Sequence, residues 1–218
     1  MSVTEDQLHT PTVSASSRGE SVKSLIWEVL QTVVLTILIF VAVRALVQNF
    51  RVEGASMEPT LHRDQYIVIN KVAYSRLDGL PISPLIGAEA KPTSPPKYIF
   101  GGPQRGDIVV FKAPGSTDRD FIKRVMGLPG EEVRVSAGNV IVNGKKLEEP
   151  YIKYHASYDF QTRTVPERQY FVLGDNRPNS TDSHLGWFVP IEDVIGRAWV
   201  TYWPPDLWGA VSPPVYAR

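Results

Sequence analysis

Two polar side chains in this chain could together perform acyl transfer: the hydroxyl of Ser56 and the amine of Lys123. Ser56 lies in residues 54–61 (GASMEPTL), between a glycine and a proline, where a serine is ordinarily a turn residue. Lys123 lies in the apolar, strand-like stretch 120–127 (DFIKRVMG). If Lys123 faces the core, burial lowers its pKa, and the neutral amine could take the proton of a serine hydroxyl. Strand alternation alone does not decide whether Lys123 or Arg124 points inward, so an outward-facing lysine stays open.

Other catalytic arrangements fit the sequence less well. The nucleophile elbow G-x-S-x-G requires a glycine where Glu58 stands. The S-x-x-K pattern occurs at residues 94–97, but the two prolines within it prevent the helical turn that the pattern needs. His155 and His184 remain candidate bases without a neighbouring signature. With four histidines, no cysteine and no H-E-x-x-H, the sequence predicts no metal and no cofactor.

A third polar element follows a strand-like run near the end of the chain. Residues 174–184 (GDNRPNSTDSH) are dense in short side chains that hydrogen-bond to the nearby backbone. On composition alone this stretch is an ordinary polar turn.

An apolar segment, residues 25–47, precedes the candidate serine. Its uncharged core, residues 29–43, is bounded by Glu28 and Arg44, whose side chains can reach toward the membrane surfaces. The usable stretch is then roughly 20 residues, about one bilayer crossing, and we expect a membrane anchor. Two alternatives stay open. One is a signal peptide cleaved near Arg44, which the long preceding tail disfavours, and the other is the buried helix of a soluble protein.

After the apolar segment the pattern changes to runs of β-branched and aromatic residues. These runs are residues 66–69, 107–111, 140–142, 170–173 and 194–203. No helical period separates them, so a parallel βαβ sheet is not expected and a mostly antiparallel β domain is favoured. The run at 140–142 is followed by Asn143-Gly144, a hairpin signal.

Composition sets the remaining limits on the class of protein. The chain has 23 Lys+Arg and 23 Asp+Glu among 218 residues, so the basic excess of a nucleic-acid-binding protein is absent. With 43% hydrophobic residues it can bury a core. We expect a disordered polar tail at 1–22, a transmembrane anchor at 23–47, and a β-rich domain at 48–218 that contains a Pro-rich insertion at about 78–103.

The order of these segments resembles the bacterial type I signal peptidases (leader peptidases), a family of serine–lysine proteases. The motifs that carry the resemblance are the apolar anchor, SMEPTL at 56–61, RGDIVVF at 105–111 and GDNRPNSTDS at 174–183. The resemblance extends over about residues 25–202. It implies an antiparallel β catalytic domain of signal-peptidase type behind one transmembrane helix. The implied activity is membrane-bound endopeptidase cleavage, which removes N-terminal signal peptides from exported preproteins at Ala-x-Ala-like sites.

The resemblance also implies a role for individual residues. Ser56 matches the nucleophile and Lys123 the general base. Ser180 matches a serine that hydrogen-bonds to the lysine amine and orients it. Asp182 matches an acidic residue that supports the site by pairing with a basic residue two positions on. That position is His184 here, so the pair is expected to depend on pH or to be a neutral hydrogen bond.

Two further implications concern the substrate. Val52, Leu61, Phe121 and Ile122 match the pockets that admit only small side chains at the first and third positions before the cut. Some relatives carry, two residues before the nucleophile, a hydroxyl that completes the oxyanion hole. That position is Gly54 here, so the backbone N–H of Ser56 is the expected donor.

The expected partners are secretory preproteins and the phospholipid membrane, with the secretion translocon as a further candidate and no nucleic acid. The expected location is the cell membrane, single-pass, with the catalytic domain on the extracytoplasmic side. Five residues near the C-terminus could contact the membrane surface or instead pack as a cover: Trp199, Tyr202, Trp203, Leu207 and Trp208. Two rival functions remain: a self-cleaving repressor-type Ser-Lys protease, normally soluble and DNA-binding, and a membrane-anchored β module that only binds partners.

Overall fold

The computed structural model describes residues 16–79, 85, 94–116, 118–214 and 216 of the chain. The chain divides into two compact units, residues 1–44 and residues 45–218, and each is described by itself. Residues 1–15 of the tail predicted at 1–22, and residues 80–84 and 86–93 of the Pro-rich insertion, lie outside the described residues.

The first unit is the long helix α1 (Ser16–Leu46). Its stretch from Val22 to Leu46 is long and apolar enough to cross a membrane, and none of that stretch is buried. The two threonine hydroxyls of the apolar stretch are satisfied inside the helix, because Thr32 donates to the carbonyl of Glu28 and Thr36 donates to the carbonyl of Thr32, both at 2.8 Å. A hydroxyl bonded in this way can lie in hydrocarbon at little cost.

The helix boundaries differ from the predicted ones at both ends. Residues 16–22, which the sequence assigned to a polar tail, are helical. Residue 47, assigned to the anchor, is the first residue of a strand. The polar composition of 16–22 did not reveal a helix because no apolar face repeats within so short a stretch.

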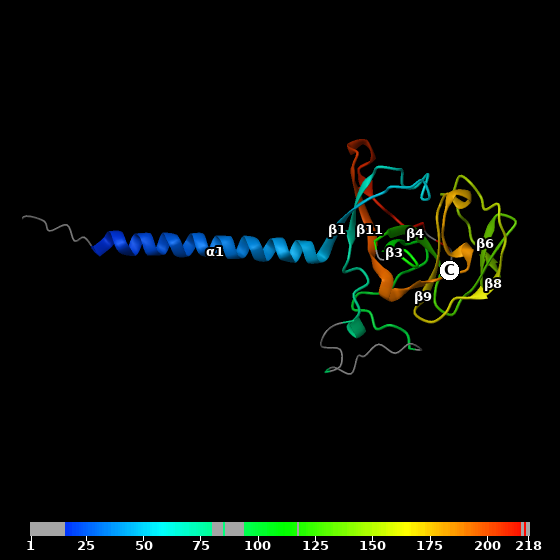
Figure 1. The fold of residues 1–218 in the computed structure, drawn as a ribbon, viewed down its shortest axis with the longest axis horizontal. Helices are drawn as coiled ribbons and strands as arrows, with labels where there is room; N and C mark the ends of the chain where they lie inside the picture. Colours follow the sequence, from blue (N-terminus) through cyan, green and yellow to red (C-terminus); the bar gives the residue numbers. More distant parts are fainter. Residues whose placement is uncertain (1–15, 80–84, 86–93, 117, 215, 217–218) are drawn as a thin grey trace, which may run out of the picture. The chain divides into compact units, whose positions relative to one another are not determined.

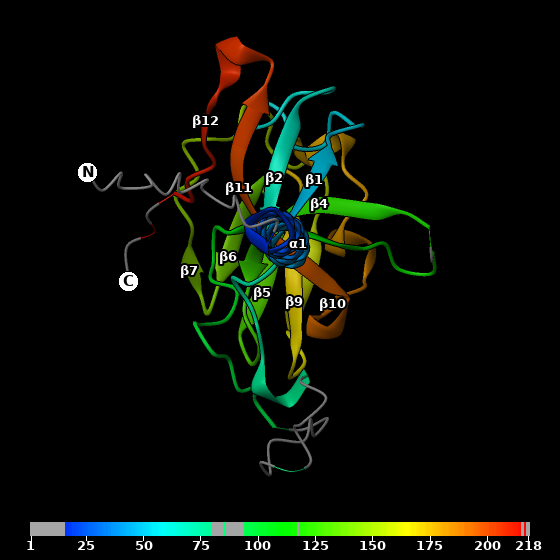
Figure 2. The same ribbon diagram turned by 90° about the vertical axis from the view of Figure 1, so that its left-hand side faces the viewer.

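The second unit is built on two antiparallel sheets, which confirms the predicted mostly β fold. The larger sheet has the order β1-β2-β11-β3-β4-β9-β10, with β12 beside β11 (Figure 2). Its strands are β1 (Val47–Arg51), β2 (Tyr66–Asn70), β3 (Ile108–Lys112), β4 (Asp120–Gly127), β9 (Gln169–Leu173), β10 (Val189–Pro190), β11 (Val194–Trp203) and β12 (Gly209–Ala210). Each of the five predicted β runs corresponds to one strand, and the predicted and observed ends differ by at most one residue.

The smaller sheet stands beside the larger one, with β6 and β8 at the side of the domain away from β1 and β11 (Figure 1). Its order is β7-β6-β5-β8. The strands are β5 (Glu132–Ser136), β6 (Asn139–Val142), β7 (Lys145–Lys146) and β8 (Phe160–Thr164). Asn143 and Gly144 both have positive φ and connect β6 to β7, as the hairpin signal predicted.

Burial along the strands explains the two kinds of sequence pattern. In β2 only Ile67 and Ile69 are fully buried, which is the alternation of a strand with one face on a core. In β3 the first four residues are all buried, as expected for a central strand covered on both faces. Val52, Met57, Leu61 and Ile122 join the β2 and β3 residues in one apolar cluster.

Short 3₁₀ helices connect the strands: η1 (Leu77–Gly79), η2 (Arg177–Asn179), η3 (Ser183–Leu185), η4 (Ile191–Asp193) and η5 (Pro205–Leu207). The base of the Pro-rich insertion is fastened to the domain. The Leu77 N–H donates to the Lys97 carbonyl at 2.8 Å. Arg168 and Asp78 form a buried ion pair at 2.8 Å. The insertion therefore leaves the domain from a fixed base.

Two strand edges are left free where the sheet does not close. β1 pairs with β2 along one edge and has no strand on the other within the described residues. β4 pairs with β3 along residues 120–124, but β9 pairs only with residues 124–127. Residues 120–123 thus offer a free edge that faces the region of Ser56.

Candidate active site

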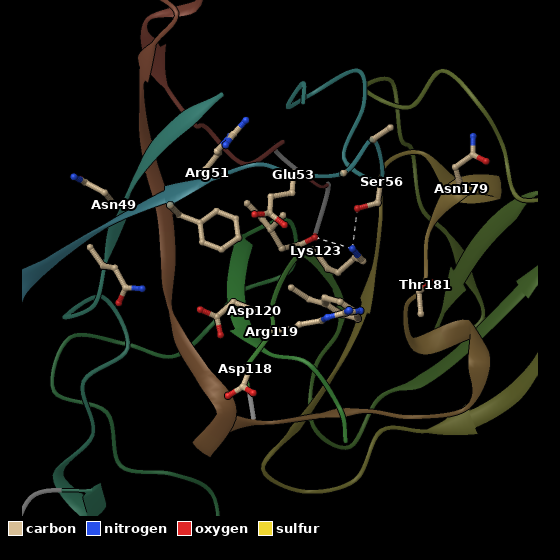
Figure 3. A pocket seen from close by; sticks show the side chains of 16 residues that line it. Asn49, Arg51, Glu53, Ser56, Asp118, Arg119, Asp120, Lys123, Asn179 and Thr181 are labelled. Atoms are coloured by element: carbon tan, nitrogen blue, oxygen red, sulfur yellow. Dashed lines mark hydrogen bonds between the residues drawn. The ribbon is translucent and has the colours of Figure 1, made fainter. Parts of the chain in front are cut away.

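Ser56 and Lys123 lie together, 67 residues apart in the sequence. Lys123 Nζ donates a hydrogen bond of 2.8 Å to Ser56 Oγ, and a second one of 3.0 Å to the carbonyl of Ile122 (Figure 3). The exposed fraction of Lys123 is 4% and that of Arg124 is 0%. The sequence left open whether Lys123 or Arg124 points inward. In the structure both side chains are buried.

The surroundings of Lys123 favour its neutral form. Burial lowers the pKa of Lys123 to about 8, while the nearby carboxylates of Asp182 and Asp175 act in the opposite direction. The desolvation effect is the largest of the three. The side chain also lies over the ring of Phe121, at 5.1 Å from the centroid. With a pKa of about 8, roughly a tenth of Lys123 is neutral at pH 7, against under about a thousandth for a lysine in water, and this neutral fraction can accept a proton.

Asn176 holds the turn that carries Ser56 through two hydrogen bonds. The backbone N–H of Asn176 donates to the Ser56 carbonyl at 2.9 Å, and its side-chain amide donates to the Ala55 carbonyl at 3.1 Å. Asn176 is 3% exposed. The sequence suggested only a local turn at this residue, because nothing in it indicates a partner 121 positions away.

Gly174, the residue after β9, lies close to the Ser56 turn. A Cβ at this position would lie 2.5 Å from the Ser56 carbonyl oxygen and 2.7 Å from the Cβ of Ser180. Only glycine permits so close an approach of the two backbone segments. Gly174 therefore sets the spacing between the Ser56 turn and residues 180–182.

Ser180 and Asp182 are both enclosed beside the dyad. Asp182 accepts a hydrogen bond of 2.9 Å from Gly174 N and pairs with His184 Nδ1 at 2.7 Å. His184 stacks on the ring of Tyr158, with the centroids 3.9 Å apart. The partnership of Asp182 with His184 thus exists in the structure. Ser180 Oγ is buried and has no hydrogen-bond partner among the described residues, so its orienting role toward Lys123 remains a prediction.

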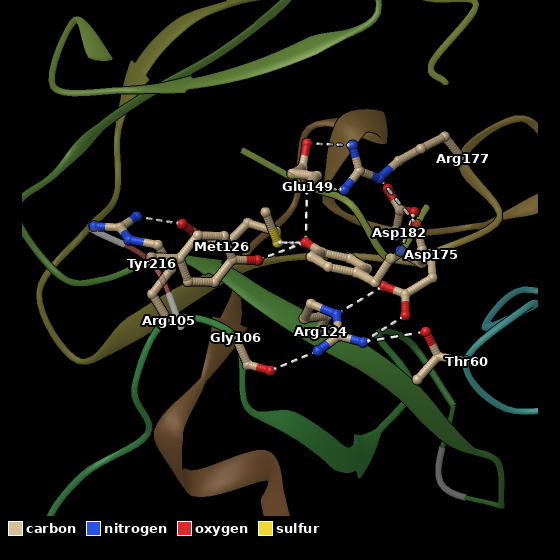
Figure 4. A network of polar contacts seen from close by, with 12 residues as sticks. Thr60, Arg105, Gly106, Arg124, Met126, Glu149, Asp175, Arg177, Asp182 and Tyr216 are labelled. Carbon is tan, nitrogen blue, oxygen red and sulfur yellow. Dashed lines mark hydrogen bonds and ion pairs between the residues drawn. The ribbon is translucent and has the colours of Figure 1, made fainter. Parts of the chain in front are cut away.

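Arg124, the residue after Lys123, belongs to a buried ion pair. Arg124 forms a two-point pair with Asp175, at 2.8 and 2.6 Å, and both side chains are fully buried. The guanidinium also donates to the Gly106 carbonyl at 2.8 Å and lies over the ring of Tyr151 (Figure 4). Because Asp175 precedes Asn176, this pair also anchors the segment that holds the Ser56 turn.

A groove of about 690 Å³ opens at the dyad. Its walls are the free edges of β1 and β4 together with the Ser56 turn. Of the residues predicted to contact substrate, Phe121 and Ile122 line the groove, whereas Val52 and Leu61 lie in the apolar cluster and are not part of its lining. Phe50, from β1, lines the groove as well.

Within the described parts of the chain, no group of three or more His, Cys, Asp or Glu side chains is placed to hold a metal ion. The arrangement present, a serine hydroxyl on a buried amine at the head of an open groove, is suited to nucleophilic attack on an extended peptide.

Comparison with known proteins identifies the family of the chain. The family model for signal peptidase, peptidase S26, matches residues 26–203. The "Probable signal peptidase I-2" of Synechocystis sp. is 41% identical over 87% of this chain and 79% of its own. A signal peptidase I of Leptolyngbya laminosa is 34% identical over 94% of this chain and 93% of its own length. The crystal structure of a signal peptidase I from Enterococcus faecalis V583 is 37% identical, covering 44% of this chain and 97% of its own, with a TM-score of 0.41. The chain belongs to the signal peptidase family, peptidase S26.

Proposed function

We propose that this membrane-anchored signal peptidase removes N-terminal signal peptides from exported preproteins through a Ser56–Lys123 dyad. The observation that carries the proposal is the 2.8 Å hydrogen bond between Lys123 Nζ and Ser56 Oγ in a site where the lysine is buried. A binding module would have no need to enclose an amine and lower its pKa beside a serine at the head of a groove.

The reaction is acyl transfer in two halves. Ser56 Oγ attacks the scissile carbonyl while neutral Lys123 takes the hydroxyl proton. The protonated Lys123 then gives this proton to the leaving amine, and the mature protein departs. In the second half Lys123 takes a proton from a water that attacks the ester carbonyl, and the signal peptide is released. Ser56 regains its proton from the ammonium, so the dyad ends as it began.

The oxyanion that forms in each half needs a donor near Ser56. Its backbone N–H is the donor in this proposal, since Gly54 offers no hydroxyl. The contacts of Asn176 with the Ala55 and Ser56 carbonyls support this role, because they hold the Ala55–Ser56 peptide group, which carries that N–H, and the peptide group after it in one orientation.

The substrate is bound as an extended strand between the free edges of β1 and β4. Both strands run toward the dyad, because each neighbour in the order β1-β2-β11-β3-β4 is antiparallel to the next. A signal peptide that runs parallel to both brings its last residues to Ser56. Phe50, Phe121 and Ile122 narrow the groove, which favours Ala-x-Ala-like ends with small side chains.

We expect the domain from residue 48 onward to lie on the extracytoplasmic side of the cell membrane. The preprotein's cleavage site emerges on that side, and β1 follows α1 without a linker. Trp199, Trp203 and Trp208 are each more than half exposed, as suits residues at a membrane surface. Protease added to intact cells should digest this domain and spare the N-terminal tail. Digestion of the tail alone would overturn this topology.

The rate of cleavage is expected to rise with pH. Because burial lowers the pKa of Lys123 to about 8, the catalytic form of the amine is lost as the pH falls below 8. The predicted kcat/KM is level above pH 9 and falls about ten-fold per pH unit below about 7. A series of kcat/KM values on one preprotein across this range checks the prediction. A profile that stays flat from pH 6 to 10 would contradict a lysine base.

A further inference from the structure

We propose that Glu53, Asp118 and Asp120 make the groove select by charge, favouring basic over acidic residues in the part of the signal peptide just before the cleavage site. This inference rests on the proposed function and concerns the substrates that the same site prefers. It assigns a role to three carboxylates that the acyl-transfer chemistry itself does not use.

The three carboxylates belong to the lining of the groove and come from both of its walls. Glu53 follows β1, Asp120 is the first residue of β4, and Asp118 lies two residues before that strand (Figure 3). All three are exposed. None of them forms an ion pair with any residue in the described ranges, whereas Asp64, just behind β1, is paired with Arg51 at 2.7 Å. Carboxylates without a partner of their own are available to a substrate cation.

The cations of the groove do not cancel these charges during catalysis. Three basic side chains line the groove: Arg51, Arg119 and Lys123. Arg51 is neutralised by Asp64. Lys123 must be neutral to act as the base. Three carboxylates therefore face one uncompensated guanidinium, which leaves the groove with an excess of negative charge.

The carboxylates lie level with a defined part of the substrate. Lys123 marks the scissile bond. Asp120, the first residue of β4, precedes it by three positions, and Asp118, two residues before the strand, precedes it by five. A substrate strand parallel to β4 advances by about the same 3.3 Å per residue. Its fourth to sixth residues before the cut therefore pass Asp120 and Asp118. Glu53 is exposed on the opposite wall of the groove, two residues after β1.

The direction of the expected preference follows from these charges. A lysine or arginine at the fifth residue before the cut gains an attractive interaction, and a glutamate there is repelled. For solvent-exposed pairs the effect is modest, about two- to five-fold in kcat/KM for each unit of charge. Salt should reduce it, because the screening length at physiological ionic strength is about 8 Å.

The experiment compares three preproteins that share one Ala-x-Ala site and differ only in Lys, Gln or Glu at the fifth residue before the cut. Full-length protein in detergent and phospholipid is assayed for kcat/KM at low and at high salt. We expect kcat/KM to fall from the Lys to the Gln to the Glu preprotein. The Lys and Glu values should differ by about ten-fold at low salt and by less at high salt. In D118N/D120N the three values should agree within about two-fold, while E167Q, an exposed carboxylate on the β8–β9 connection, should keep the full range.

Each outcome decides the proposal. Equal rates for the three preproteins with the wild type would overturn it, and so would a charge preference that D118N/D120N leaves unchanged. Failure of the wild type to cleave even the glutamine preprotein is a different result. It would remove the proposed function, and the inference would fall with it.

Discussion

Replacing Lys123 with methionine is expected to lower kcat/KM for signal-peptide cleavage by about 10³-fold or more, with the domain still folded. Methionine has a similar length and suits a buried site, so the change removes the amine and leaves the packing largely in place. Without a base, Ser56 keeps its proton and the first acyl transfer stops. The measurement is cleavage of a purified preprotein, with circular dichroism to verify folding.

Two companion variants show whether the base is responsible. Lys123→Arg keeps a positive charge that is not lost at accessible pH, so it should be inactive as well. Lys145→Met, an exposed lysine in the short strand β7, should cleave as the wild type does. Full activity in Lys123→Arg would mean that a different group accepts the proton.

Replacing Asp175 with asparagine is expected to lower the free energy of unfolding by about 3–5 kcal/mol. The change leaves the guanidinium of Arg124 buried without a counter-charge, at a site where both side chains have no exposed surface. For a domain of this size the loss corresponds to a fall in Tm of about 10 °C or more. Thermal and urea unfolding of the variant and the wild type would measure it.

The matched control is the surface pair of Arg51 and Asp64, whose side chains are 54% and 60% exposed. Asp64→Asn should cost at most about 1 kcal/mol, since water screens such a pair. A second comparison tests the cause. Removing both buried charges, as in Arg124→Met with Asp175→Leu, should destabilise less than Asp175→Asn alone. Equal losses for Asp175→Asn and Asp64→Asn would contradict the role given to burial.

Much of the fold could be predicted from the sequence, because its strands carry local signals. Ile67 and Ile69 alternate with half-buried residues, and the buried run of β3 has no polar interruption until Lys112. The exact limits of α1 could not be predicted, since the helix continues into a polar stretch without a periodic apolar face. The pairing of β1 with β2, and the free edge it leaves, also depends on contacts that no local pattern encodes.

The candidate site divides in the same way. Ser56 and Lys123 could be named from the resemblance, and the structure places their side chains in contact. Asn176 and Gly174 stand in a motif that composition describes only as a polar turn. Their contacts with the Ser56 turn arise because β9 ends beside it. For Val52 and Leu61 the resemblance named residues that the structure places elsewhere. Both are apolar and lie near Ser56 in the sequence, but they pack in the apolar cluster and do not line the groove.

The most direct test of the account is cleavage of a preprotein with an Ala-x-Ala site by the wild type, Ser56→Ala and Ser212→Ala. Ser212 is an exposed serine far along the chain from the dyad and serves as the matched control. The account predicts that the wild type and Ser212→Ala release the mature protein with its N-terminus directly after the site, and that Ser56→Ala releases none while remaining folded. Cleavage at the same position by Ser56→Ala would contradict it.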